Sequence, residues 1–286
     1  MDIKDLIIFK KVAQEGSISR AAKNLNYVQS NVTMRIKQLE DELGAPLFYR
    51  NGKGVALTAN GEILLTYAKQ IIYLVEQSIK AVQNNGTNPM GTLKIGSTES
   101  TAAVRLPSIL TTYYATYPEV ELILETHTTE ELIQLVLDRK LEGAFIAGNV
   151  HHPDLHSILF QEEELILISK YPLSSFKDLN EVNVLAFSHG CYYRNMLEKW
   201  LHNEGIYPKR VLEFGTIEAI IGCVKAGMGT AIMMKSIINE REQSLTLTSL
   251  PNPFSRVPTT FIMRKDVIYS AALRKFLDMI EHIHTQ

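Results

Sequence analysis

The chain has 286 residues, of which 45% are hydrophobic and 21% are charged, and this globular composition excludes a disordered chain, a collagen and a disulfide scaffold. The formal net charge is −2, but residues 1–90 carry 11 basic and 8 acidic side chains, whereas residues 91–286 carry 18 and 23. The basic excess therefore lies at the N-terminal end, where it favours an anionic partner such as nucleic acid.

Three short helices are predicted between residues 5 and 43, where apolar residues recur with helical spacing. The first ends at Gly16, a common helix stop, and Ser19 can cap the second. Residues 26–28 form a turn before the third helix, which covers residues 30–43.

The third helix is amphipathic. Its apolar side chains step by four, three and four residues and make one buried stripe: Val32, Ile36, Leu39 and Leu43. The opposite face is polar and short near its start, with Gln29 at the beginning, Ser30 and Met34 on the face and Thr33 on its flank. In a major groove, glutamine can pair bidentately with adenine, and serine or threonine can bond either base type. A solvated helix face without a partner is the alternative interpretation.

A β-hairpin and a long helix are predicted next. Two short apolar stretches flank Asn51-Gly52, which places Arg50 and Lys53 at the hairpin tip. Residues 59–84 predict a helix about 40 Å long. Its apolar seam repeats every three to four residues: Leu64, Ala68, Ile71, Val75, Ile79 and Val82. The seam can pack on its own domain, but its length favours a dimer, because a small N-terminal domain cannot cover it.

The remainder alternates strands and helices. Strands at residues 93–96, 120–125 and 144–147, with helices at 104–117 and 129–141 between them, are typical of a parallel sheet. A second series has strands at residues 165–169, 184–187, 211–214 and 230–233 and helices at 194–203 and 218–226. Strand 261–263 and the final helix, 270–282, are expected to return to the first half. Two α/β lobes joined by a double crossover are therefore predicted.

The chain shows no sign of a membrane span, an export signal or a metal site. No apolar run approaches the roughly 20 residues that cross a bilayer, and the first residues alternate charged with apolar side chains. Cys191 and Cys223 lie 32 residues apart without a CxxC motif or a histidine at metal-ligand spacing. We therefore expect a cytoplasmic protein with no cofactor.

Five runs of residues at fixed spacing carry a family resemblance: AAKNL (21–25), VQSNVTMRIKQLE (28–40), ELG (42–44), LFYR (47–50) and LTANG (57–61). They closely resemble the DNA-binding domain of LysR-type transcriptional regulators, and the order of parts fits this family over the whole chain. Three positions depart from the commonest pattern, where Ser30 replaces proline, Thr33 replaces serine and Met34 replaces arginine. A different operator preference is expected from them.

The resemblance implies an N-terminal winged helix-turn-helix, a long linker helix and an α/β effector domain with two Rossmann-like lobes, like a periplasmic binding protein. The expected bounds are 1–58 for the DNA-binding domain, 59–90 for the dimerisation helix with its hinge, and 91–286 for the effector-binding domain. Lobe one would comprise 91–161 and 265–286, and lobe two 162–264.

The resemblance also implies the partners. A dimer or tetramer would bind double-stranded DNA at an interrupted inverted repeat and contact RNA polymerase. Gln29, Ser30, Thr33 and Met34 are the candidates for base readout. The candidates for phosphate contacts are Arg35, Lys37, Arg50 and Lys53.

A small effector is expected in the cleft between the lobes, at the carboxyl ends of strands. The candidate contacts are polar residues that follow strands: Thr98, Ser100, Thr101, Thr128, Thr129, Ser188, His189, Arg194 and Thr216. Several of these hydroxyls can instead be ordinary helix caps. Arg194 would fix the carboxylate of an anionic effector, or form an ion pair within the protein. A redox role for Cys191 is disfavoured, because the only cation clearly placed to lower its pKa is Arg194.

The alternative from another class is an enzyme whose cleft performs chemistry, with an N-terminal module for oligomerisation alone. The sequence has no nucleophile elbow, P-loop or dinucleotide fingerprint, and its candidate cleft residues include no clear acid–base pair. A periplasmic solute receptor would share the lobes but needs a signal peptide. The sequence therefore favours a regulator over both.

Overall fold

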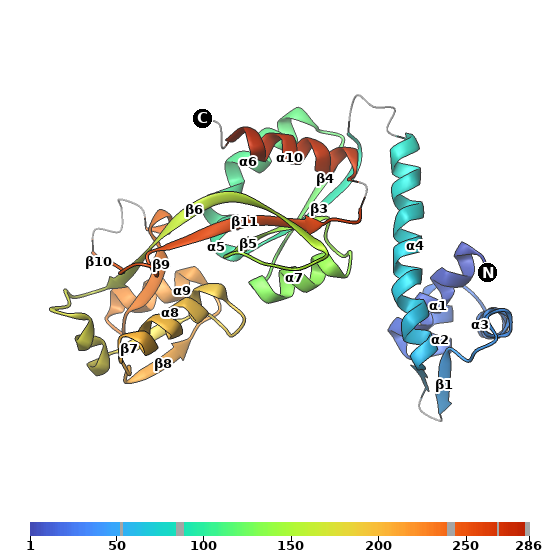
Figure 1. Cartoon of the computed structure of the whole chain (residues 1–286), viewed down its shortest axis with the longest axis horizontal. Helices are drawn as coiled ribbons and strands as arrows, with labels where there is room; N and C mark the ends of the chain where they lie inside the picture. Colours follow the sequence, from blue (N-terminus) through green and yellow to red (C-terminus); the bar gives the residue numbers. More distant parts are fainter. Residues whose placement is uncertain (52–53, 84–88, 239–243, 268, 284–286) are drawn as a thin grey trace. The chain divides into compact units, whose positions relative to one another are not determined.

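The computed structural model describes residues 1–51, 54–83, 89–238, 244–267 and 269–283. The chain forms two compact units, Met1–Asn85 and Gly86–Gln286 (Figure 1). None of the helices in these described ranges combines the length and the apolar character needed to span a membrane.

The N-terminal unit is a set of helices followed by a short hairpin. Its elements are α1 (Ile3–Glu15), α2 (Ile18–Asn24), α3 (Gln29–Leu43), β1 (Phe48–Asn51), β2 (Gly54–Leu57) and α4 (Ala59–Gln83). The N-cap of α2 is Ser17, whose side chain accepts from the backbone N–H of Arg20, so the prediction of Ser19 as the cap is wrong. The Ser19 hydroxyl instead donates to Gln29 Oε1 across the turn at 2.9 Å.

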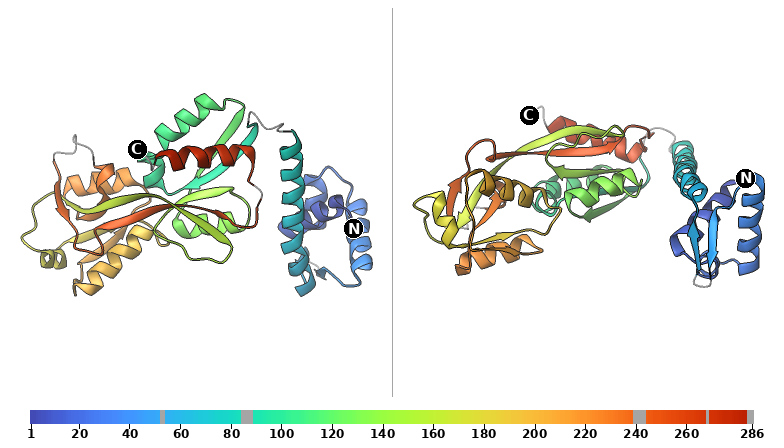
Figure 2. Two further views of the ribbon diagram at one scale, coloured as in Figure 1. Left: turned by 45° about the horizontal axis from the view of Figure 1, so that its top comes forward. Right: turned by 60° about the horizontal axis from the view of Figure 1, so that its bottom comes forward.

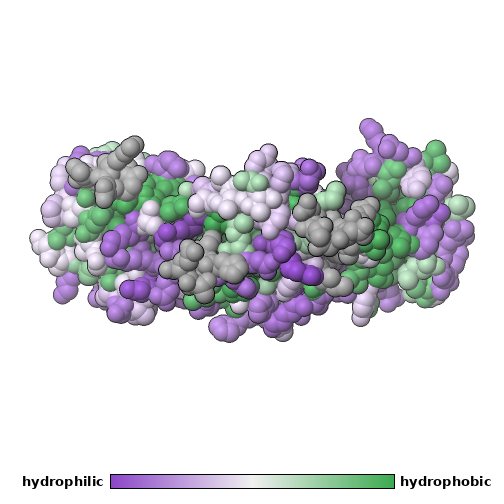
Figure 3. Space-filling model, turned by 90° about the horizontal axis from the view of Figure 1, so that it is seen from above, coloured by the Kyte–Doolittle hydropathy of each residue, from purple (hydrophilic) through white to green (hydrophobic). Residues whose placement is uncertain are grey.

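Helix α4 packs on the core of its unit through one side of its first part. Ala68 and Ile72 are buried in the core of the unit, where α4 packs against α1. Farther along, Leu74, Ile79 and Val82 are 47%, 51% and 78% exposed. Figure 3 shows hydrophobic residues gathered at this end of the N-terminal unit. The predicted seam therefore packs on its own domain from Leu64 to Ile71, whereas its last two members, Ile79 and Val82, are exposed.

Lobe one of the C-terminal unit is a parallel sheet covered on both faces. Its elements are β3 (Gly91–Ser97), α5 (Glu99–Val104), α6 (Leu106–Thr116), β4 (Val120–Thr126), α7 (Thr129–Leu137), β5 (Gly143–Ala147) and α10 (Ala271–Ile283). Helices α6 and α10 cover one face of the sheet and α7 covers the other (Figure 1, Figure 2). The helix predicted over residues 104–117 is broken at Arg105, which separates α5 from α6. The one predicted over 129–141 ends at Leu137, because Arg139 takes a left-handed backbone conformation.

Lobe two is built around the parallel pair β7 and β8. Its elements are η1 (Phe176–Glu181), β7 (Asn183–Ala186), α8 (Tyr192–Asn203), β8 (Arg210–Glu213), α9 (Ile217–Ala226), β9 (Ala231–Met234), η2 (Lys235–Ile237) and β10 (Thr246–Ser249). Its core lies around Trp200, which is fully buried and packs edge-on against Phe176.

Two long antiparallel strands, β6 (Leu155–Ser169) and β11 (Arg256–Arg264), connect the lobes. The sheet order is β10-β6-β11-β5-β3-β4, with β9 also paired to β6. The register between the two strands shifts between Thr259 and Thr260, where the strands pass from the core of one lobe to that of the other. This confirms the predicted fold class and the double crossover, although both strands are longer than the sequence predicted.

Candidate functional site

Helix α3 presents a polar face away from the core of its unit. Val32, Ile36 and Leu39 are at most 1% exposed, as their spacing predicted. Leu43, the fourth residue of the predicted stripe, is 42% exposed, because it is the last residue of the helix. On the opposite side Gln29, Ser30 and Lys37 are exposed, and Met34 is 52% exposed. The beginning of the helix therefore offers an amide, a hydroxyl and a thioether at its surface, and an ammonium group two turns later.

Two hydrogen bonds involve residues of this surface. Gln29 Oε1 accepts from the Ser19 hydroxyl, and the half-buried Thr33 hydroxyl donates to the Gln29 carbonyl at 3.0 Å. Arg35 is turned toward α1, where its guanidinium contacts the carboxylates of Asp5 at 2.5 Å and Asp2 at 3.5 Å. Its proposed contact with a phosphate is thus not supported, since its charge is already paired within the unit.

The hairpin docks on the turn between α1 and α2. The backbone N–H of Val55 donates to the Gly16 carbonyl at 3.0 Å, and a Cβ at Gly54 would lie only 2.4 Å from that oxygen. Gly54 also has a φ of 144°, so a larger residue would displace the wing. The predicted contacts of Arg50 and Lys53 lie outside the described side chains.

A cavity of about 380 Å³ lies between the lobes of the C-terminal unit. Its walls are the turns that follow β3, β4 and β5 in lobe one and β7 and β8 in lobe two, which is where an open α/β sheet places its ligands. Six of the nine predicted effector residues line it: Thr98, Ser100, Thr128, Thr129, Ser188 and Thr216. Two of them are also caps, because Thr128 and Thr216 accept from the first turns of α7 and α9.

The other three predicted residues do not line the cavity. Thr101 is fully buried and accepts from the Thr98 hydroxyl at 3.0 Å, whereas His189 is exposed. Arg194 is held within lobe two by the carboxylates of Glu198 and Glu213, at 2.9 and 2.6 Å. The ion-pair interpretation of Arg194 is therefore the correct one, and the hypothesis of an anionic effector loses its only predicted cationic contact.

Ten lining residues were not among the predicted contacts, although they lie in or beside the same strand-to-helix turns. They are Glu99, Thr126, His127, Glu131, Ala147, Phe187, Cys191, Tyr192, Tyr193 and Gly215. Glu99 extends from lobe one to lobe two, where one carboxylate oxygen accepts from the backbone N–H of Ile217 at 3.4 Å. Burial of this carboxyl raises its pKa, because the charged form loses hydration.

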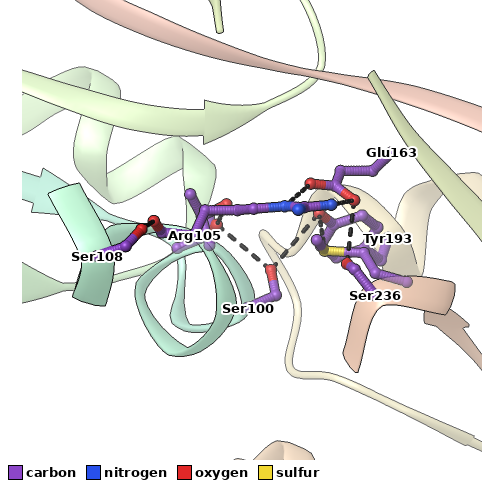
Figure 4. Close-up of polar contacts among 9 residues, drawn as sticks. Ser100, Arg105, Ser108, Glu163, Tyr193 and Ser236 are labelled. Carbon is purple, nitrogen blue, oxygen red and sulfur yellow. Dashed lines mark hydrogen bonds and ion pairs between the residues drawn. The ribbon is translucent and has the colours of Figure 1, made fainter. Parts of the chain in front are cut away.

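Polar contacts join the lobes beside the cavity (Figure 4). Arg105 of lobe one donates from Nε and Nη2 to the two oxygens of Glu163 on β6, at 2.7 and 2.9 Å. Ser236 of lobe two donates to the same carboxylate at 3.0 Å. The Ser100 hydroxyl also lies 3.5 Å from that of the buried Tyr193. A ligand that touches Ser100 would therefore lie next to contacts that join the lobes.

The ring of Tyr192, which lines the cavity, packs against the turn that follows β5. A Cβ at Gly148 would lie 2.1 Å from the ring of Tyr192, so the close packing of lobe two on this turn needs glycine. Beside Tyr192, burial raises the pKa of the Cys191 thiol, which keeps it protonated and poorly nucleophilic. Nor do the described residues contain a group of three or more histidine, cysteine or acidic side chains that could hold a metal.

Comparison with known families accounts for both units. The family model "LysR substrate binding domain" matches residues 86–283, and "Bacterial regulatory helix-turn-helix protein, lysR family" matches residues 3–62. The chain belongs to the LysR family. It is a LysR-type transcriptional regulator, with a helix-turn-helix DNA-binding domain and a substrate-binding domain.

Curated relatives and solved structures of this family match the chain over its length. The transcriptional regulator SoxR of Arthrobacter is 44% identical over 284 residues, or 99% of this chain and 97% of that protein. CzcR of Bacillus cereus is 42% identical over 286 residues, or 99% and 98%. Full-length OxyR from Pseudomonas aeruginosa has a TM-score of 0.70 at 19% identity, covering 99% and 95%, and CbnR bound to its target DNA has 0.66 at 22%, covering 99% of both chains. The relatives are regulators, so the enzyme alternative is discarded for this LysR regulator.

Proposed function

We propose that this LysR regulator recognises operator DNA with the first turns of α3, and that a small effector in the cavity between the lobes changes this binding. The observation that carries the proposal is the exposed polar start of α3, which lies over a fully buried apolar stripe. Gln29 and Ser30 at this start, with Thr33 and Met34 one turn later, would contact base edges. The Thr33 hydroxyl would do so as an acceptor, because it donates its proton to the Gln29 carbonyl. Lys37 would contact a phosphate.

LysR regulators form oligomers, and we propose that α4 supplies the contact in a dimer or a tetramer. The exposed apolar side chains in its second half support this role, as do Ile63 and Tyr67 in its first half, each 59% exposed. A two-fold dimer would place its two α3 helices in successive major grooves of an interrupted inverted repeat. The complex would act on transcription in the cytoplasm, in contact with RNA polymerase.

The effector would bind the turns of both lobes at once. Hydroxyl groups of Thr98 and Ser100 face those of Ser188 and Thr216 across the cavity. A ligand that contacts both walls stabilises the closed arrangement of the lobes, because it binds that arrangement better than an open one. The change would reach the DNA-binding domains through the oligomer.

Binding of duplex DNA, followed by fluorescence anisotropy of the labelled duplex, tests the assignment of α3. Thr33→Ala is expected to change the preference among sequences, whereas Lys37→Ala should weaken binding to all duplexes and reduce the salt slope by about 1. Lys199→Ala, which removes an exposed charge from α8, is the matched control. If Thr33→Ala binds every duplex with the same affinity as the unmodified protein, the assignment is contradicted.

A further inference from the structure

The charged groups on the wall of the cavity are mostly acidic. Among the described residues that line it, Glu99 and Glu131 are carboxylates and His127 is the sole residue with a basic group. No lysine or arginine belongs to this described lining, since Arg194 is paired with Glu198 and Glu213 elsewhere in lobe two. An anionic ligand would therefore meet negative charge without a cationic side chain to balance it.

The two carboxylates differ in the hydrogen bonds that they already accept. Glu131 accepts from the backbone N–H and the hydroxyl of Thr128, both at 3.0 Å, and lies 3.9 Å from His127 Nδ1. The bonds from Thr128 lower the pKa of Glu131 and make it the partner of Thr128 in the capping box of α7. Glu131 is thus committed to the structure of lobe one.

Glu99 has acceptor capacity to spare. Its one hydrogen bond within the described chain is the long bond from the N–H of Ile217, and it forms no ion pair there. An ionised carboxylate has about four acceptor sites, so most of those on Glu99 are free for a ligand in the cavity. Besides burial, the negative charge of Glu218 raises its pKa, so a cation beside Glu99 would relieve an unfavourable charge.

The surroundings of Glu99 suit an organic cation. Phe187, Tyr192 and Tyr193 line the same cavity, and aromatic faces attract ammonium groups. Ser188 and Thr216 provide hydroxyl groups for a polar substituent at the other end of a small molecule. A bare metal ion is less suited to this wall, because the described residues place no group of three or more acidic, histidine or cysteine ligands there.

We propose that the effector is a small molecule with a protonated amine, whose ammonium group pairs with Glu99 in the cavity between the lobes. This inference rests on the proposed function of the cavity as the effector site. The carboxylate can accept from the ammonium and from Ile217 N–H together, so the amine reinforces a contact that already joins the lobes.

Matched probes test the proposal with the full chain. Benzylamine, benzyl alcohol and benzoate share a ring and differ in charge, as do butylamine, butanol and butyrate. Melting followed by the fluorescence of Trp200, the single tryptophan, should shift upward with the amines and stay unchanged with the carboxylates. Calorimetric titration then gives the Kd of each amine that raises the melting temperature.

Two variants separate charge from structure. Glu99→Gln keeps an oxygen that can accept from Ile217 N–H but removes the charge, so amine binding should weaken at least tenfold. Glu218→Gln removes the same charge from an exposed neighbour that does not line the cavity, and amine binding should stay within about twofold. The hydrogen bond from Ile217 N–H can persist in Glu99→Gln, but this bond alone does not hold an amine. We therefore expect Glu99→Gln not to restore amine binding.

If benzoate or butyrate raises the melting temperature, and still does so in Glu99→Gln, the proposal that the effector is an amine is overturned. The cavity would then remain the effector site. A lack of response to every amine would also count against the amine site. Operator binding in the anisotropy assay judges the proposed function separately, because it does not depend on which probe occupies the cavity.

Discussion

The Arg105→Met variant is expected to destabilise the effector-binding domain. Glu163 is 2% exposed, and its carboxylate accepts two hydrogen bonds from Arg105 and one from Ser236. Without the guanidinium, the buried charge keeps a single hydroxyl donor. Breaking a buried ion pair costs about 3–5 kcal/mol. Because the Arg105 side chain is 28% exposed and Ser236 remains, we expect about 2–3 kcal/mol here.

Thermal melting followed by Trp200 fluorescence measures this loss. Trp200 is the single tryptophan and is fully buried in lobe two, so its signal reports on the effector-binding domain alone. For a domain of about 200 residues, 1 kcal/mol corresponds to about 2–4 °C in Tm, so the expected decrease is roughly 4–12 °C. Arg256→Met is the matched control, since its ion pair with Glu162 is 71% and 57% exposed and should contribute less than about 1 kcal/mol.

A second variant identifies the cause of the loss. Adding Glu163→Gln to Arg105→Met removes the buried charge, so part of the lost stability should return. A Tm for Arg105→Met within about a degree of the Arg256→Met control would refute the assignment of this ion pair as a structural link between the lobes.

Three further predictions concern the cap of α7, the acid limb of stability and the oligomer. Thr128→Ala removes the α7 cap and should cost about 1 kcal/mol, so an unchanged Tm would contradict it. The hydrogen bond from Arg264 is the main cause that lowers the pKa of Asp266 from 3.8 to about 2, so its contribution to stability is present above pH 4 and lost as the pH falls toward 2. Asp266→Asn should therefore flatten acid unfolding over that range, and curves that coincide with the unmodified protein would refute it. Leu74→Glu on the exposed face of α4 should give smaller species in sedimentation without changing the Trp200 melt, and an unchanged distribution would argue against a dimer through α4.

The sequence predicts features whose cause is local or topological. The spacing of Val32, Ile36 and Leu39 is a property of one helix, so the buried stripe of α3 was predictable. The turns of the cavity were predictable as well, because the carboxyl ends of neighbouring parallel strands meet at one edge of a sheet. Thr98 and Ser188 thus face one cavity although they lie far apart in the chain.

Partners that depend on tertiary packing were not predictable. From the sequence, Arg194 could extend into the cleft or pair with Glu213. The burial of Trp200 on the same helix fixes the rotation of α8, and this rotation directs Arg194 to Glu213. Glu99 looks like an ordinary acidic residue in a first helical turn until lobe two is placed opposite it. Residues 155–164 of β6 were missed because the charged run from Glu162 to Glu164 interrupts the apolar pattern before the predicted strand at 165–169. These residues nevertheless pair with β11, and exposed and buried side chains are mixed along them.

Selection from a random pool of duplexes, followed by anisotropy titration of the enriched sequence, tests the central claim most directly. We predict enrichment of an interrupted inverted repeat that binds the full chain with a Kd at least tenfold lower than a shuffled duplex at near-physiological salt, a difference of about 1.4 kcal/mol. No enrichment, with equal affinity for every duplex, would contradict the account of α3 as a reader of sequence.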